Sequence, residues 1–137
     1  MIGDSVSTAL LQKALDGTWQ RQRAISNNIA NHETPGYKAK QVSFEALLEK
    51  EAASLIREGN SGTNAKNDIG RIRKSIKSMQ IKEYDNNLTE ARADGNNVDL
   101  DLENIEMAKT QIQYQYLARS LSDSFSRLRY AISEGRK

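Results

Sequence analysis

The feature that most constrains the fold is a stretch from residue 101 to residue 133 that contains neither proline nor glycine. Its larger side chains recur at alternating intervals of four and three, which is the period of a coiled-coil helix. The series consists of Met107, Gln111, Tyr114, Ala118, Leu121, Phe125, Leu128 and Ile132. The sequence therefore predicts a C-terminal helix over residues 101–134, with Asp101 as its N-cap.

A second long helix is predicted over residues 4–31, which also lack proline. The same spacing runs through Leu11, Leu15, Thr18, Gln22, Ile25 and Ile29. Pro35 disfavours a helical conformation at Thr34, so the helix must end before it. Pro35 and Gly36 are the preferred centre of a type II turn, which requires a positive φ at Gly36.

Matching stripes at the two ends predict a mainly α fold in which two long terminal helices pack as an antiparallel coiled coil. We expect one domain over residues 1–137, with an irregular and variable middle segment over residues 37–97. Phe44, Leu47 and Leu48 favour a short helix in that segment, and residues 58–64 have loop composition. The stretch from Ile69 to Ile81 fits a helix or a strand, so minor β structure is compatible with it.

The composition limits how much of the fold one chain can stabilise by itself. Hydrophobic residues make up 37% of the chain, with two Phe and one Trp, whereas globular domains have about 45–50% apolar residues. We therefore expect part of the apolar burial to come from other chains. The absence of Cys excludes disulfides and thiolate chemistry.

The N-terminal residues lack the basic start and apolar run of a secretory signal. No window approaches the roughly 20 apolar residues of a membrane span. These observations predict a cytosolic protein, or one exported without a cleaved signal peptide, and no direct insertion into a membrane.

Three groups of polar residues are candidates for chemical sites. The run from Asp94 to Asp101 is similar to a calcium loop, but the sixth position holds Asp99 instead of Gly and the twelfth holds Ile105 instead of Glu. His32 is the only histidine, so a triad or an imidazole cluster would lack partners. We predict no catalytic, cofactor or metal site and no small-molecule substrate.

The third group is a basic run without any acidic residue, formed by Arg71, Arg73, Lys74, Lys77 and Lys82. No aromatic residue is interleaved to stack a base, so nucleic acid is not an expected partner. The run indicates a solvated face or a patch that meets an acidic neighbour. An alternative function is therefore a cytosolic coiled-coil adaptor that binds an acidic partner through Arg71 to Lys82.

Two motifs flank the middle segment. Asn27-Asn28-Ile29-Ala30-Asn31 leads into Thr34-Pro35-Gly36-Tyr37, and Gly95-Asn96-Asn97-Val98-Asp99-Leu100-Asp101 precedes the C-terminal helix. Asn competes for backbone hydrogen bonds, so the first motif indicates a specified helix exit or a plain helix cap. Together the motifs resemble the two signatures of the flagellar rod, hook and hook-associated protein family.

The short middle segment resembles that of proximal-rod members, since 57 residues separate Tyr37 from Gly95. Tyr114, Leu121, Phe125 and Leu128 lie in a segment that is most similar to one particular proximal-rod subunit. The resemblance implies a structural subunit of the periplasmic rod of the basal body. It implies export by the flagellar type III apparatus without a cleaved signal, assembly above the membrane ring and export gate, and torque transmission for motility.

The partners that the resemblance implies are further copies of the chain, other flagellar rod proteins, and membrane-ring and export-gate proteins. It implies no enzyme activity and no cofactor. The signature and subunit-interaction residues that it implies are Asn27, Asn28, Ile29, Asn31, Thr34, Pro35, Gly36, Tyr37, Gly95, Asn96, Val98, Asp99, Leu100, Tyr114, Leu121, Phe125 and Leu128.

Overall fold

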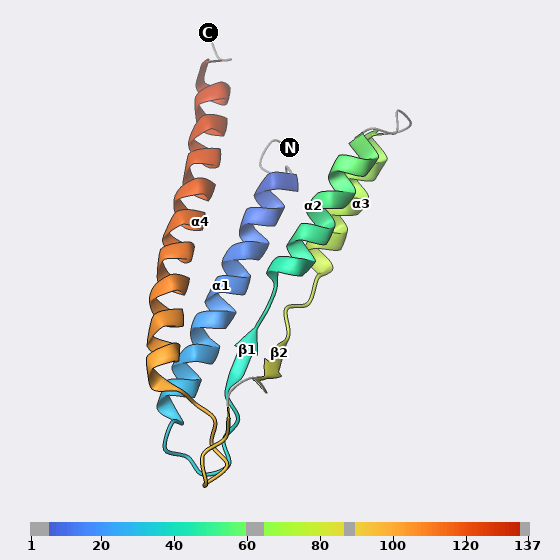
Figure 1. The fold of residues 1–137 in the computed structure, drawn as a ribbon. Helices are drawn as coiled ribbons and strands as arrows, with labels where there is room; N and C mark the ends of the chain where they lie inside the picture. The colour runs from blue at the N-terminus through green and yellow to red at the C-terminus, as the bar shows by residue number, and fades with distance from the viewer. Residues whose placement is uncertain (1–5, 60–64, 87–89, 135–137) are drawn as a thin grey trace. The chain divides into compact units, whose positions relative to one another are not determined.

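The computed structural model describes residues 6–59, 65–86 and 90–134 and is mainly α-helical. Figure 1 shows four helices and two short strands in the described part of the chain. Their bounds are α1 (Val6–Ala30), β1 (Lys40–Val42), α2 (Glu45–Gly59), α3 (Ala65–Ser78), β2 (Glu83–Asp85) and α4 (Leu100–Glu134). The predicted loop over residues 58–64 falls mostly outside the described residues.

The long terminal helices α1 and α4 pack together in antiparallel orientation, as the sequence predicts. Asn28 of α1 bonds Glu103 of α4, and the earlier residue Arg21 bonds the later residue Gln113.

The N-cap predicted for α4 is wrong, because it lies two residues too far along the chain. Asp99, and not Asp101, caps α4, because its Oδ1 accepts the N–H groups of Asp101 at 3.0 Å and Leu102 at 3.2 Å.

The chain forms two compact units, and each terminal helix contributes to both. The first, here called the α2–α3 unit, comprises residues 1–15, 44–80 and 116–137. Its apolar cluster contains Ala9 of α1 with Ile72 and Ile76 of α3. The stretch from Ile69 to Ile81, which fits a helix or a strand by sequence, is helical as far as Ser78. Ile72 and Ile76 are four residues apart and both buried, as one face of a helix requires. Helices α2 and α3 lie side by side (Figure 1).

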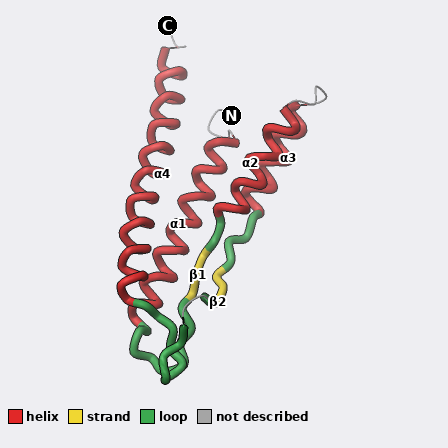
Figure 2. Tube along the Cα trace, in the orientation of Figure 1, coloured by secondary structure: helices red, strands yellow, loops and turns green. Residues whose placement is uncertain are grey.

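The second unit, here called the β1–β2 unit, comprises residues 16–43 and 81–115. Strands β1 and β2 pair antiparallel, with Lys40 opposite Asp85 and Val42 opposite Glu83. An ion pair joins the Lys40 ammonium to the Asp85 carboxylate across the strands. Figure 2 shows the loops that leave α1 and enter α4 lying at one end of this unit.

Polar side chains share the interior of the β1–β2 unit with apolar ones such as Ile25, Val42 and Val98. Thr18, Asn28, Glu103 and Thr110 are all buried, and the Thr110 hydroxyl donates to the Glu106 carbonyl at 2.7 Å. The predicted apolar stripe of α4 is therefore only partly correct. Leu121 and Leu128 are half-buried, whereas Tyr114, Phe125 and Ile132 are exposed.

Among the described helices, none combines the length and apolar character that a membrane span requires.

Candidate functional site

The exit of α1 is closed by hydrogen bonds from its own asparagines. The Asn31 N–H donates to the carbonyls of Asn27 and Asn28, each at 3.1 Å. The Asn31 side-chain amide donates to the Asn27 carbonyl at 2.8 Å, and the Thr34 hydroxyl donates to Asn31 Oδ1 at 3.2 Å. Asn31 thus satisfies carbonyl groups that a helix end leaves without partners.

The turn after α1 has the predicted form. The Tyr37 N–H donates to the Thr34 carbonyl at 3.2 Å, with Pro35 and Gly36 at the two central positions. Gly36 has a φ of 72°, as a type II turn requires. Its N–H donates to the Asp94 carbonyl at 2.8 Å. The turn is therefore bonded directly to the loop that carries the second motif.

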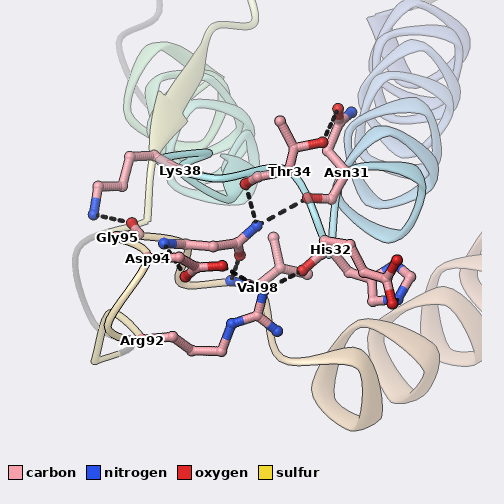
Figure 3. Close-up of polar contacts among 10 residues, drawn as sticks. Asn31, His32, Thr34, Lys38, Arg92, Asp94, Gly95 and Val98 are labelled. Carbon is pink, nitrogen blue, oxygen red and sulfur yellow. Dashed lines mark hydrogen bonds and ion pairs between the residues drawn. The ribbon is translucent and has the colours of Figure 1, made fainter.

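Asn96 of the second motif joins that loop to the α1 exit. Its buried side-chain amide donates to the Asn31 carbonyl at 2.9 Å and the Thr34 carbonyl at 2.8 Å. Its Oδ1 accepts the Val98 N–H at 2.8 Å. The dashed lines at Asn31, Thr34 and Val98 in Figure 3 mark these three hydrogen bonds to the Asn96 side chain. The side chain of Asn96 therefore provides the hydrogen-bond partner for three backbone groups.

Two glycines allow the loops to approach each other closely. Gly95 has a φ of 81°, and a Cβ placed on it would lie 3.5 Å from the Gly36 Cα. Lys38 Nζ donates to the Gly95 carbonyl at 2.7 Å, which adds a further bond between the loops (Figure 3). The positive φ favours glycine at both positions.

Asn28 lies between α1, β1 and α4, and all of its hydrogen-bonding capacity is used. Its amide nitrogen donates to the Lys40 carbonyl at 2.8 Å and to Glu103 Oε1 at 2.9 Å. Its oxygen accepts the Lys40 N–H at 2.8 Å and the Tyr37 hydroxyl at 3.2 Å. An amide has two donors and two acceptor sites, so this buried side chain is fully satisfied.

Asn97 supports the beginning of the two-stranded sheet in a similar way. Its Oδ1 accepts the Ala39 N–H at 2.7 Å, and its Nδ2 donates to the Asn86 carbonyl. The Asn86 N–H in turn donates to the Ala39 carbonyl at 2.7 Å. We call Asn28, Asn31, Asn96 and Asn97, with the backbone groups that they bond, the asparagine site.

The ionisable groups at this site respond to burial and to their neighbours. Burial raises the pKa of the Glu103 carboxyl, and the charges of Glu106 and Asp99 act in the same direction, while the bond from Asn28 opposes the rise. Burial also raises the pKa of the Tyr37 hydroxyl, against the opposing effect of Lys40. Both groups therefore favour their neutral forms more than exposed side chains do.

The acidic residues of the calcium-like run have structural partners. Asp94 Oδ1 accepts the Asn96 N–H at 3.0 Å, and this bond together with Arg92 lowers the pKa of the Asp94 carboxyl. Arg92 also donates to the His32 carbonyl (Figure 3). In the described ranges, no three acidic or histidine side chains gather as metal ligands would.

The structure unites most, but not all, of the residues that the sequence indicates. The segments that contain Asn27 to Tyr37 and Gly95 to Leu100 meet at the asparagine site. Tyr114, Leu121, Phe125 and Leu128 lie farther along α4, and Leu121 and Phe125 line a hollow with Leu15 in the α2–α3 unit. These four residues belong to a helix surface and not to the asparagine site.

Sequence reasoning missed Lys40, Arg92 and Glu103 as parts of this arrangement. Glu103 had a detectable signal, because it lies four residues before Met107 and so continues the inner stripe of α4 backwards. An acid on such a stripe indicates a buried polar partner. Lys40 bonds the Asn28 side chain only through its backbone N–H and carbonyl. Every residue except proline has both groups, so the sequence gives no signal for this contact.

Comparison with known proteins identifies flagellar relatives along almost the whole chain. A family model described as flagella basal body rod protein matches residues 11–38. The flagellar basal body rod protein FlgB of Bacillus subtilis (strain 168) is 35% identical over 133 residues, which cover 92% of each chain. FlgB of Borrelia hermsii is 32% identical over 93% of this chain and 96% of its own, and FlgB of Escherichia coli (strain K12) is 28% identical over 90% and 91%.

Proposed function

Because the chain belongs to the FlgB family of flagellar basal body rod proteins, we propose that it is a proximal-rod subunit that assembles with copies of itself and with other rod proteins. In this role it contributes to the rod above the membrane ring and export gate and transmits motor torque. The role is structural and requires neither catalysis nor a cofactor.

The observation that carries the proposal is the apolar surface that α4 leaves uncovered. Ile112 is 69% exposed and Tyr116 is 71% exposed, and Ile105, Tyr130 and Ile132 are also more than half exposed. Of the six largest fully buried side chains among the described residues, Phe44 and Ile76 are apolar, and the other four are polar: Asn28, Asn96, Thr18 and Thr110. Aliphatic and aromatic residues that stay outside while amides are buried indicate a surface that neighbouring subunits cover.

A second exposed anchor lies on α1. Trp19 is 56% exposed, and the Arg23 guanidinium lies 6.0 Å from the centre of its ring. Trp and Arg are the residues that most often dominate the binding energy of an interface. Both terminal helices therefore offer surface suited to subunit contacts.

The asparagine site supports the mechanical part of the proposal. Its hydrogen bonds join the α1 exit, β1 and the loop before α4 through directional contacts. Buried and fully satisfied polar networks specify one geometry more strictly than apolar packing does. We infer that the asparagine site fixes the angle at which the terminal helices meet, so that torque is passed on with little local bending.

An assembly experiment tests the proposal. Ile112→Asp, expressed in a strain that lacks its own copy of the protein, should leave the helical content of the purified chain unchanged and abolish rod assembly. Gln111→Asp adds the same charge at an exposed neighbouring position and is the matched control. Motile cells and normal basal bodies with Ile112→Asp would contradict an interface on this face of α4.

The proposal also includes location and export. We propose that the subunit is exported by the flagellar type III apparatus into the periplasmic rod without removal of N-terminal residues. Mass spectrometry of the chain recovered from basal bodies should find its N-terminal peptide intact. The adaptor alternative predicts that the chain remains in the cytosolic fraction, and family membership argues against it.

A further inference from the structure

The charges of this chain are segregated into two segments of opposite sign. From Ile69 to Lys82 there are five basic residues and no acidic one, and from Asp94 to Glu106 there are five acidic residues and no basic one. The basic residues are Arg71, Arg73, Lys74, Lys77 and Lys82, and the acidic ones are Asp94, Asp99, Asp101, Glu103 and Glu106. The net charge of +2 conceals this separation.

Four of the five basic residues lie on α3, and Lys74 and Lys77 are on its outward face. Ile72 and Ile76 are buried in the α2–α3 unit, which fixes the inner side of the helix. Lys74 and Lys77 are exposed, so their long side chains extend from the other side. This face presents positive charge on aliphatic stems.

The acidic segment includes an apolar helix face that the described chain leaves uncovered. In the first turns of α4, Leu102 is 38% exposed and Ile105 is 53% exposed, beside the exposed carboxylate of Asp101. Large aliphatic side chains flanked by acids suit a partner that supplies apolar contact and positive charge together.

A cavity lies next to this face. It has a volume of about 370 Å³, and its lining combines Leu102 with the acids Glu103 and Glu106 and the bases Arg21 and Lys40. Glu103 is 7% exposed. Within the described residues, the Glu103 carboxylate accepts a hydrogen bond from Asn28 and has no basic partner. A buried carboxylate without a cation is the group that an incoming lysine or arginine would stabilise most.

We propose that the basic outer face of α3 in one copy docks onto the start of α4 in a second copy. The lysine stems cover Leu102 and Ile105, and their ammonium groups approach Asp101 and the cavity that Glu103 lines. This inference rests on the proposed function, because it names the surfaces through which the rod subunits meet.

A second copy is the occupant that the charges favour. Asp94 and Glu106 already pair with Arg92 and Lys109. Lys74 on α3 and Asp101 on α4 are both exposed, and one chain supplies both, so a single kind of subunit can satisfy both surfaces. The two surfaces differ from each other, and the contact is therefore heterologous. Heterologous contacts build rings or open helical arrays instead of closed pairs, which is the geometry that a rod requires.

Disulfide trapping tests the contact directly, because the natural chain contains no Cys. Two differently tagged chains, one with Lys74→Cys and one with Asp101→Cys, are co-expressed in a strain without its own copy. Basal bodies are then purified, oxidised and separated on a non-reducing gel. We expect a dimer that carries both tags and disappears on reduction, and a much weaker band when Arg119→Cys, on an exposed part of α4, replaces Asp101→Cys.

Each other outcome contradicts the contact. If both chains are present in basal bodies without a mixed dimer, the docking surfaces are wrong while the proposed function stands. If neither chain is retained in basal bodies, the proposed function and the docking fail together. A single chain that carries both Lys74→Cys and Asp101→Cys is the further control. If its disulfide forms only within the monomer, the two faces meet inside one subunit and the proposed contact between copies is wrong.

Charge reversal gives an independent readout. Lys74→Glu and Asp101→Lys should each lower the yield of basal bodies by about tenfold or more, because like charges then oppose each other. The two substitutions in one chain restore opposite signs at every contact and should recover most of the yield. A double variant no better than the single ones would overturn the pairing.

Discussion

At the scale of single residues, Asn28 is the side chain on which the asparagine site depends most. Asn28→Asp replaces two N–H donors with an oxygen and places a carboxylate against Glu103 Oε1, now 2.9 Å from the amide nitrogen. We expect this variant to cost about 3 kcal/mol or more, since the Lys40 carbonyl and Glu103 both lose their donor. Rod assembly should fail, and the helical circular dichroism signal should fall.

Asn27→Asp is the control for that variant. It makes the same chemical change at the adjacent exposed position, where only an unfavourable interaction of a few tenths of a kcal/mol with the helix dipole is expected. Equal effects of the two variants would mean that Asn28 has no special role.

Gly36 tests the turn itself. A Cβ at this position would have no atom within 4 Å, so any penalty for Gly36→Val comes from the φ of 72° and not from a clash. A β-branched residue in that conformation costs about 1–3 kcal/mol. The variant should be expressed and exported but should assemble poorly, while Gly70→Ala, in the open surface of α3, should assemble normally. Normal basal bodies with Gly36→Val would show that the turn geometry is dispensable.

The raised pKa of Glu103 predicts a pH dependence of order in the β1–β2 unit. The folded state holds the proton more tightly than the unfolded state, so stability is greatest at low pH and is lost as pH rises from about 4 through the raised value. The helical signal of the wild-type chain should therefore decline over this range. Glu103→Gln, which cannot titrate, should reduce the slope, and Glu90→Gln, at an exposed acid that is not among the neighbours acting on Glu103, should keep it. Identical slopes for wild type and Glu103→Gln would remove Glu103 as the cause.

How much the sequence reveals at this scale depends on whether a residue acts through its own conformation or through distant contacts. The positive φ at Gly36 could be predicted, because Pro35-Gly36 specifies a turn locally. The burial of Asn28 against Lys40 and Glu103 could not be predicted, because it depends on which backbone groups lie beside it after folding.

At the scale of elements, α4 shows where periodicity succeeds and where it fails. The period gave a helix within one residue of its observed start and matched its observed end at Glu134. It identified the inner face only in part, because Thr110 is buried although it lies off the predicted stripe, and Tyr114 and Phe125 are exposed although they lie on it. Hydrophobic patterns locate a seam only when that seam is apolar.

Leu121→Asp tests the packing of α4 in the α2–α3 unit. Leu121 is half-buried and lines the hollow that contains Leu15 and Phe125, so a carboxylate there should cost about 1–2 kcal/mol in the isolated chain. Rod assembly should be impaired, since the surrounding surface is also expected to be covered by neighbours. Gln115→Asp, at an exposed position of α4 outside this hollow, should assemble normally. Equal motility of the two variants would mean that Leu121 is not part of a packed face.

The middle segment was predictable in type but not in arrangement. The apolar spacing around Leu47 and Leu48 identified α2, and the stretch that includes Ile72 and Ile76 was ambiguous until burial placed both on one side of α3. The strands β1 and β2 have three residues each. Pairs this short are set by the contacts of Asn86 and Asn97 at their ends, and carry almost no pattern of their own.

At the scale of the whole molecule, the low apolar content has a clear structural counterpart. The apolar cluster of the α2–α3 unit is small, with Ala9, Ile72 and Ile76 at its centre. Among the side chains whose burial the structure describes, eleven large apolar ones are exposed, and most of them are on α4. The stability of a long helix comes mostly from packing of its apolar face. We therefore expect full order of the chain only in the assembled rod. The single domain over residues 1–137 stays a prediction.

The most direct test of this dependence on neighbours is a thermal melt of the purified, dilute chain followed by far-ultraviolet circular dichroism. We predict a monomer with less helix than α1 to α4 together would give, and a broad melt without a cooperative transition, because the exposed faces lack their partners. A sharp, cooperative transition that starts from the full helical content of all four elements would contradict it and would show that a single chain is sufficient for the fold.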